Sequence, residues 1–143
     1  MDGDETVIEF TTNALEDVTS KIPREKRGRV LDKLIEVTES PNPRRYVDYF
    51  EGHRKLGKIY IDGEIRTICC IVTHLPGYEL LPVFAITEHD YSTLQKHDKK
   101  AVSAVERLSD LETRADVEEY VENRPNTFQS EEIRELRDKL RDT

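Results

Sequence analysis

The clearest pattern along the chain lies between residues 55 and 91, where apolar and polar positions alternate. Three segments there are rich in β-branched and aromatic residues, which favour strands; they cover residues 56–61, 65–73 and 79–87. Asp62-Gly63-Glu64 and Pro76-Gly77, which separate them, have the composition of tight turns. The pattern therefore predicts an antiparallel meander of three strands.

A strand and two helices are predicted before the meander. Alternating residues at 6–10 predict a short strand that joins the sheet. Asn13 and Glu16 have the spacing of a capping box, so the first helix is expected to begin there and to end near residue 22. Pro23 suits the first turn of a second helix, which ends before Pro41. The apolar stripe of that helix comprises Val30, Leu31, Leu34, Ile35 and Val37.

After residue 91 the apolar spacing becomes helical. Helices are predicted from residue 92 to about 108, over 115–121, and from Ser130 onward, where Ile133, Leu136 and Leu140 share a face. We interpret residues 1–95 as one domain and 96–143 as an acidic helical extension packed on or beside it. Two roles for the extension remain open: covering a basic surface in cis, or serving stability and oligomerisation.

Composition limits the function classes. The chain carries a net charge of −8, yet twelve of its 22 Lys and Arg residues lie between positions 21 and 66. An acidic protein with a basic middle is unlike a generic nucleic-acid binder, and a local field of this kind steers ligands. No apolar run is long enough for a membrane span, and the first residues lack signal-peptide character, so we expect a cytoplasmic protein that does not enter membranes.

The sequence predicts no metal site and no cofactor. Cys69 and Cys70 are adjacent on a predicted strand, where neighbours point to opposite faces, so the pair is a poor metal clamp. Their side chains are expected to be buried as small hydrophobes. The histidines at positions 53, 74 and 97 are not at ligand spacing with one another or with the cysteines.

The order of these elements resembles the RelE/ParE superfamily of type II toxins. The matching stretches, spread over residues 6–95, are IEFTTNALEDV, VLDKLIEVTESPNP, GKIYIDGEIRTICCIV and LLPVFAITEHDY. The resemblance implies an α+β fold in which an N-terminal strand and two helices pack on an antiparallel sheet of about four strands, followed here by a C-terminal helical extension. It also implies a ribosome-associated endoribonuclease that cleaves mRNA without a metal. The expected partners are the ribosome, mRNA and a cognate antitoxin. Two assemblies remain open: a homo-oligomer, or a hetero-oligomer with the antitoxin.

The resemblance also indicates which residues would act. Arg66, directly after the hairpin turn, is expected to bind the scissile phosphate, since a planar fork of donors suits phosphate oxygens. His89 and Tyr91, which follow the last strand, are expected to transfer protons or stack on a base. Lys58 and Tyr60 share a face of the first meander strand. Contacts to the phosphate backbone of RNA are expected from Arg44, Arg45, Arg54 and Lys55.

For each of these residues a structural role is an alternative interpretation. Arg66 could be a surface arginine of a half-exposed strand, and His89 a hydrogen-bonding loop histidine. The alternative function is a RelE-like binding module without nuclease activity, either directed at DNA gyrase or degenerate and held by a partner. The negative net charge and the few basic residues on the predicted sheet favour that alternative.

Overall fold

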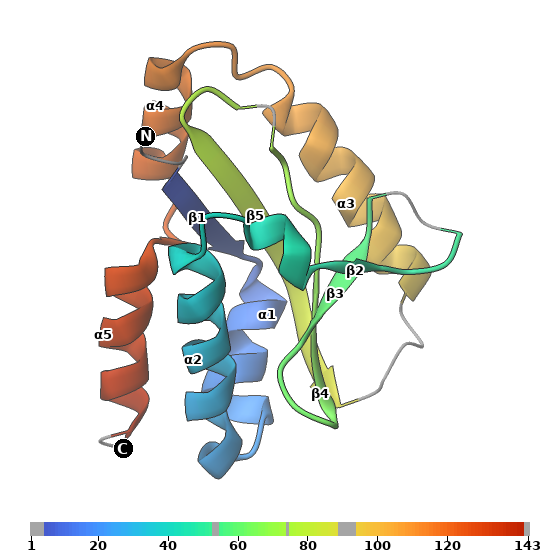
Figure 1. The fold of residues 1–143 in the computed structure, drawn as a ribbon, viewed down its shortest axis with the longest axis vertical. Helices are drawn as coiled ribbons and strands as arrows, with labels where there is room; N and C mark the ends of the chain where they lie inside the picture. The colour runs from blue at the N-terminus through green and yellow to red at the C-terminus, as the bar shows by residue number, and fades with distance from the viewer. Residues whose placement is uncertain (1–4, 53–54, 74, 89–93, 142–143) are drawn as a thin grey trace.

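The structure is a computed structural model that describes residues 5–52, 55–73, 75–88 and 94–141 (Figure 1). Its described residues form an α+β fold with one mixed six-stranded sheet and five α-helices. The strands are β1 (Glu5–Phe10), β2 (Asp48–Tyr49), β3 (Gly57–Tyr60), β4 (Ile65–Cys69), β5 (Tyr78–Glu88) and β6 (Thr127–Phe128). The helices are α1 (Thr12–Glu16), α2 (Arg24–Glu39), α3 (Leu94–Leu108), α4 (Arg114–Asn123) and α5 (Ser130–Arg141). A π-helical turn, η1 (Asp17–Lys21), follows α1, and a 3-10 turn, η2 (Pro43–Tyr46), precedes β2.

The strands lie in the order β2-β3-β4-β5-β1-β6. The predicted meander is present, because β3 pairs antiparallel with β4 and β4 antiparallel with β5. β1, however, pairs parallel with β5, so the sheet is mixed and larger than the antiparallel sheet of about four strands predicted from the sequence. The additional strands β2 and β6 have two residues each, which is too short for an alternating pattern to reveal.

Helices cover both faces of the sheet (Figure 1). On one face α1, α2 and α5 enclose the largest apolar cluster, to which the sheet contributes Ile8, Ile59 and Leu81 among others. On the other face α3 lays Ala101 and Ala104 against Ile68 and Phe84. A third cluster joins α4 to the ends of β1 and β5. No helix among the described residues is long and apolar enough to cross a membrane.

The first helix begins two residues earlier than the capping-box pattern predicts. Thr11 is the N-cap, and its hydroxyl accepts a hydrogen bond from the Ala14 N–H at 3.1 Å. The same hydroxyl donates to the Phe84 carbonyl at 3.1 Å. Asn13 lies inside the helix and is exposed, so the Asn13/Glu16 capping box is not formed.

The π-helical turn brings a carboxylate to the edge of β5. β1 pairs with β5 as far as Phe10 and Val83, and beyond that point no strand in the described part of the chain lies beside this edge of β5. Asp17 occupies the position, and its Oδ2 accepts the Ile86 N–H at 2.9 Å. The side chain thereby satisfies a buried backbone donor that strand pairing leaves open.

Asp17→Ala is expected to lower the free energy of unfolding by about 1–3 kcal/mol, because the Ile86 N–H loses its acceptor while staying buried. Urea denaturation measures the change. Glu16→Ala is the matched control: its side chain is exposed, so the effect should stay within about 0.5 kcal/mol. Equal unfolding free energies for the two variants would mean that the hydrogen bond contributes nothing.

The C-terminal helices share the core of the strands. Ile133 of α5 is fully buried in the cluster beneath α2. Two ion pairs border the packing of α5 on α2: Arg137 Nη1 lies 2.8 Å from Asp32 Oδ1, and Arg134 Nη1 lies 2.6 Å from Glu39 Oε2. On α4, the Tyr120 hydroxyl donates to the Glu9 carboxylate of β1 at 2.7 Å. These helices are therefore part of the same packed structure as the sheet.

Candidate functional site

Three of the residues singled out from the sequence meet on one face of the meander. Lys58, Tyr60 and Arg66 all point to the α3 side of the sheet, since Ile59 between the first two is buried on the other side. Tyr60 pairs directly with Arg66 across β3 and β4. The Arg66 guanidinium carbon lies 4.2 Å from the centroid of the Tyr60 ring, and Lys58 Nζ lies 5.4 Å from it. We call these three residues the Tyr60 cluster.

The Tyr60 cluster includes one of the two large hydrophobic side chains that are exposed among the described residues. The Tyr60 side chain is 44% exposed, which is large for an aromatic residue on a sheet face. Its hydroxyl is within 3.5 Å of Asp48 Oδ2 on the neighbouring strand. Lys58 Nζ also lies 4.7 Å from the ring centroid of Phe50, so the amine bridges two aromatic rings. A face with an accessible ring and the Lys58 amine beside it suits contacts to an anionic aromatic ligand such as a nucleotide.

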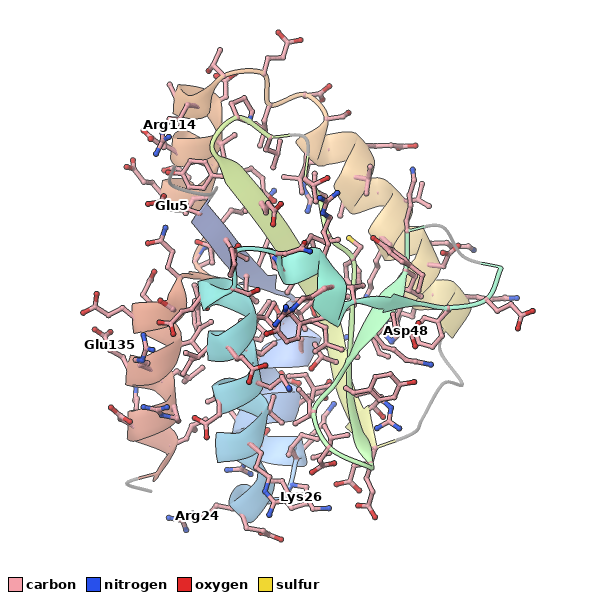
Figure 2. The ribbon with its side chains drawn as sticks, viewed as in Figure 1. Glu5, Arg24, Lys26, Asp48, Arg114 and Glu135 are labelled. Atoms are coloured by element: carbon pink, nitrogen blue, oxygen red, sulfur yellow. The ribbon has the colours of Figure 1, made fainter. Side chains whose placement is uncertain are left out.

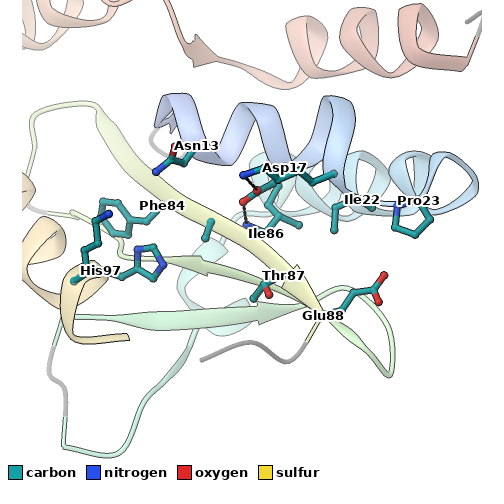
Figure 3. Close-up of a pocket in the computed structure, with 12 residues that line it drawn as sticks. Asn13, Asp17, Ile22, Pro23, Phe84, Ile86, Thr87, Glu88 and His97 are labelled. Carbon is teal, nitrogen blue, oxygen red and sulfur yellow. Dashed lines mark hydrogen bonds and ion pairs between the residues drawn. The ribbon is translucent and has the colours of Figure 1, made fainter. Parts of the chain in front are cut away.

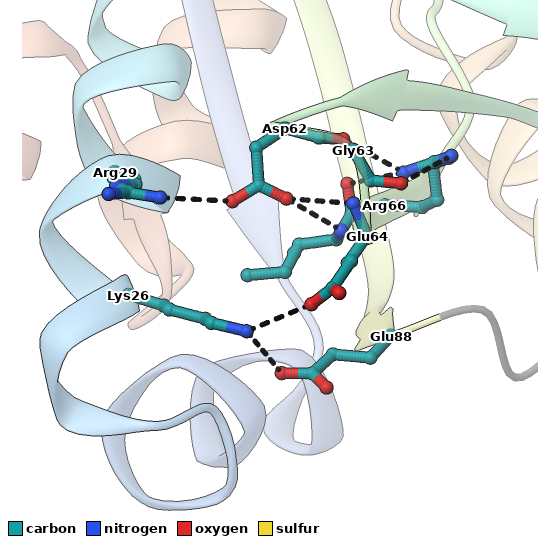
Figure 4. A network of polar contacts seen from close by, with 8 residues as sticks. Lys26, Arg29, Asp62, Gly63, Glu64, Arg66 and Glu88 are labelled. Carbon is teal, nitrogen blue, oxygen red and sulfur yellow. Dashed lines mark hydrogen bonds and ion pairs between the residues drawn. The ribbon is translucent and has the colours of Figure 1, made fainter.

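Arg66 itself is turned inward, contrary to the expectation of a surface arginine or an open phosphate-binding group. Only 7% of the residue is exposed. Its Nη1 donates to the carbonyls of Asp62 and Ile65 at 3.0 and 3.2 Å, and its Nη2 donates to the Gly63 carbonyl at 3.3 Å (Figure 4). The guanidinium therefore closes the β3–β4 turn from inside, and its first role is to hold that hairpin.

Charged side chains tie the same hairpin to α2 (Figure 4). Lys26 Nζ lies 3.1 Å from Glu64 Oε2 and 3.6 Å from Glu88 Oε1, so one amine joins the hairpin turn to the end of β5. Asp62 Oδ1 accepts the N–H groups of Glu64 and Ile65, and these two hydrogen bonds lower the pKa of the Asp62 carboxyl. The network fixes the turn from two sides, with Arg66 on one and α2 on the other.

The expected RNA-binding arginines do not all join this surface. Arg45 stacks on Tyr46, its guanidinium carbon 5.1 Å from the ring centroid, and Tyr46 packs against the core on the α2 side of the sheet. Arg44 is exposed on the same turn, and Lys55 is exposed just before β3. Of the remaining predicted site residues, Arg54, His89 and Tyr91 lie outside the described residues.

Helix α3 covers the part of the face next to the Tyr60 cluster. His97 lies over Phe84 of β5 with nearly parallel rings, the centroids 6.5 Å apart and the planes 16° from each other. His97 is buried, as are Ala101 and Ala104 one and two turns further along the helix. The sheet face is thus divided into a half covered by α3 and an accessible half that carries Tyr60.

A cavity of about 540 Å³ opens beside β5, between η1 and α3 (Figure 3). It combines apolar and charged lining residues; the charged and polar ones include Asp17, Lys21, Thr87, Glu88, Lys96 and His97. Asp17 was not among the residues predicted from the sequence to be functional, and His97 was weighed only as a metal ligand. The sequence does contain a signal that these two side chains are buried. Asp17 falls on the same helical face as the apolar residues Ala14 and Val18. His97 falls on the same helical face as Ala101, Ala104 and Leu108.

The two cysteines are buried within β4 and directly after it, as predicted. Burial, with smaller effects of neighbouring charges, raises the pKa of the Cys70 thiol to about 12, and burial raises that of Cys69 well above its usual value. Within the described part of the chain, no group of three or more His, Cys, Asp and Glu side chains is arranged to hold a metal ion.

Both thiols are therefore expected to be unreactive in the native protein. The thiolate is the reactive species, and it is scarce at pH 8 when the pKa is this high. A disulfide reagent such as DTNB should titrate two thiols in denaturant, whereas in buffer the reaction should be roughly 100-fold slower or more, limited by opening of the fold. Complete reaction of the native protein within seconds would contradict the burial of these residues.

The chain was also compared with known proteins. It matches no protein-family model, and it has no significant similarity to any curated protein.

Proposed function

We propose that the chain is a cytoplasmic RelE-like toxin module that cleaves ribosome-bound mRNA without a metal, using the accessible half of the meander. One observation carries the proposal: Lys58, Tyr60 and Arg66 converge there, beside the end of β5, which His89 and Tyr91 follow directly in the sequence. The order of a strand, two helices and a meander, the order that the resemblance rests on, supports it further.

Every group that the proposed reaction needs is present among Lys58, Tyr60, His89 and Tyr91. The 2′-hydroxyl of the RNA loses a proton and its oxygen attacks the adjacent phosphorus, while the 5′-oxygen leaves and takes up a proton. Lys58 places its amine near the phosphate and stabilises the developing negative charge. Tyr60 offers its ring to a neighbouring base, and His89 and Tyr91 exchange the protons.

Arg66 takes a different role in this proposal from the one expected at first. Its guanidinium already donates three hydrogen bonds to the carbonyls of the turn, so binding a phosphate directly would require giving these up. We assign it as a positioning residue that holds the hairpin and places a positive charge against the Tyr60 ring. A cognate antitoxin would then cover the half of the face that α3 leaves accessible, in a hetero-oligomer with the toxin.

Purified protein incubated with translating ribosomes, followed by mapping of the mRNA ends, tests the proposal. We expect new ends inside the ribosome-bound region of the message, and the double variant Lys58→Ala/Tyr60→Ala should lower the cleavage rate about 10- to 100-fold by removing a phosphate contact and a stacking contact. Tyr49→Ala/Lys139→Ala removes the same residue types from exposed positions elsewhere and should cleave normally. Intact message at every codon would refute the nuclease.

A second candidate, the binding module without nuclease activity, is favoured by a specific observation. Arg66 is buried and bonded to the turn, and α3 already occupies part of the face. Such a module would arrest growth by holding its target, with gyrase as one possibility. Growth arrest with intact message, persisting after combined substitution of Lys58, His89 and Tyr91, would identify this function.

A further inference from the structure

A groove between α2 and α5, on the far side of the sheet from the Tyr60 cluster, has an unusual lining. It encloses about 550 Å³, a volume typical of small-ligand sites. Its lining residues are Arg24, Glu25, Arg27, Gly28, Arg29, Asp32, Arg137 and Leu140. Four of the eight are arginines, in a protein whose net charge is −8. We call this cavity the α2–α5 groove.

The arginines are only partly neutralised. Arg137 pairs with Asp32 at 2.8 Å, and Arg29 Nη1 lies 3.6 Å from Asp62 Oδ2. Arg27 uses its Nε to donate to the Ile22 carbonyl at 2.8 Å, which orients the guanidinium, and neither Arg24 nor Arg27 forms an ion pair with a described residue. Arg24 projects outward from the first turn of α2 (Figure 2). Four arginines thus stand against two lining carboxylates, Glu25 and Asp32, so the groove retains a net positive charge.

The placement of these charged side chains limits which ligands the groove can bind. Guanidinium forks match phosphate oxygens, while none of the described residues that line the groove has an aromatic side chain to stack on a base. Arg24 and Arg29 are five residues apart, a rise of about 7.5 Å along the helix axis with a rotation of about 140° about it, so they lie at opposite borders of the groove. Two carboxylates, Glu25 and Asp32, also line the groove, and Asp32 is paired with Arg137. Outside the lining, Glu36 follows on α2 and Asp138 lies on α5. A long polynucleotide would extend to Glu36 and Asp138, whereas a short chain of phosphates within the groove would not.

We propose that the α2–α5 groove binds an oligophosphate of about three phosphates and recognises the phosphates rather than a nucleobase. The same chemistry is present in free tripolyphosphate and in a nucleoside triphosphate. Gly28 suits such a site, since it lines the groove without a side chain and a Cβ placed there would meet no atom within 4 Å. The ligand can thus approach the helix backbone, and a substituted side chain would project into open space.

Substitutions of Gly28 test this proposal without disturbing the fold. Gly28→Glu places a carboxylate in the groove, and Gly28→Gln places a side chain of the same size without the charge; both residues favour a helix over glycine. Calorimetric titration with tripolyphosphate at low salt should give binding to the wild type. Gly28→Glu should weaken this binding about tenfold or more relative to Gly28→Gln, because like charges repel at close range.

Further titrations test which phosphate compounds bind and which arginines contribute to the binding. Arg24→Gln should weaken binding, whereas Arg114→Gln, an exposed arginine on α4, should not. ATP should bind with an affinity close to that of tripolyphosphate, and AMP should bind far more weakly. Equal binding by Gly28→Glu and Gly28→Gln, or tight binding of an RNA oligonucleotide in the groove without binding of tripolyphosphate, would overturn the proposal. Because binding is measured directly, the outcome is independent of the proposed mRNA cleavage.

Discussion

Ile133→Ala is expected to lower the free energy of unfolding by about 2–5 kcal/mol. Ile133 is fully buried where α5 packs on α2, so the shortened side chain loses apolar burial and leaves a cavity. Urea denaturation followed by circular dichroism measures the change. Glu135→Ala, two residues further along α5 and exposed (Figure 2), should change the unfolding free energy by less than about 0.5 kcal/mol.

The result bears on the role of the acidic C-terminal helices. If α5 were a detachable cover, Ile133→Ala would leave the unfolding of the rest of the chain unchanged, and that outcome would contradict its place in the core. Instead α5 contacts α2, on the face of the sheet opposite the Tyr60 cluster. The helix that lies on the same face as the cluster is α3. Deleting the chain from about Val121 should therefore destabilise the fold rather than expose a basic surface.

Arg66→Ala is expected to lower the free energy of unfolding by about 2–4 kcal/mol. The substitution removes three hydrogen bonds to carbonyls of the β3–β4 turn and the contact with the Tyr60 ring. It also leaves those carbonyls without their donors. Thermal unfolding and urea denaturation give the change, and cleavage assays on this variant are interpretable only below its unfolding temperature.

Arg29→Ala is the matched control for Arg66→Ala. Arg29 belongs to the same polar network, but its side chain is 68% exposed and its nitrogen lies 3.6 Å from Asp62 (Figure 4). An exposed ion pair of this kind contributes at most about 1 kcal/mol. If the two variants unfolded alike, Arg66 would not be the residue that holds the hairpin.

The parts of the fold with a regular apolar period were predictable from the sequence. The three meander strands and α2 have long patterns, and their turns contain the residues that such turns need. The parallel pairing of β1 with β5 was missed because strand direction in a sheet depends on the path of the chain between strands, which no local pattern records. β6 was not predicted because a strand of two residues is too short to show an alternating apolar pattern.

The sequence indicates which residues of the candidate site lie on one face, but it does not indicate which contacts their side chains form. The period of two along β3 places Lys58 and Tyr60 together, and the position of Arg66 after the turn places it opposite Tyr60. That the guanidinium would turn back onto the carbonyls of Asp62, Gly63 and Ile65 depends on the backbone shape of the turn. The role of Asp17 was hidden for a similar reason, since the open edge of β5 exists only after β1 has ended.

The central claim is that the accessible half of the meander face, with Tyr60 at its centre, contacts the message on the ribosome. The most direct measurement places a photo-crosslinking phenylalanine analogue at position 60, and in a parallel sample at position 135 on α5, followed by irradiation of translating ribosomes. We expect crosslinks from position 60 to mRNA nucleotides and none above background from position 135. Crosslinks from position 60 to protein alone, or equal RNA crosslinking from both positions, would contradict it.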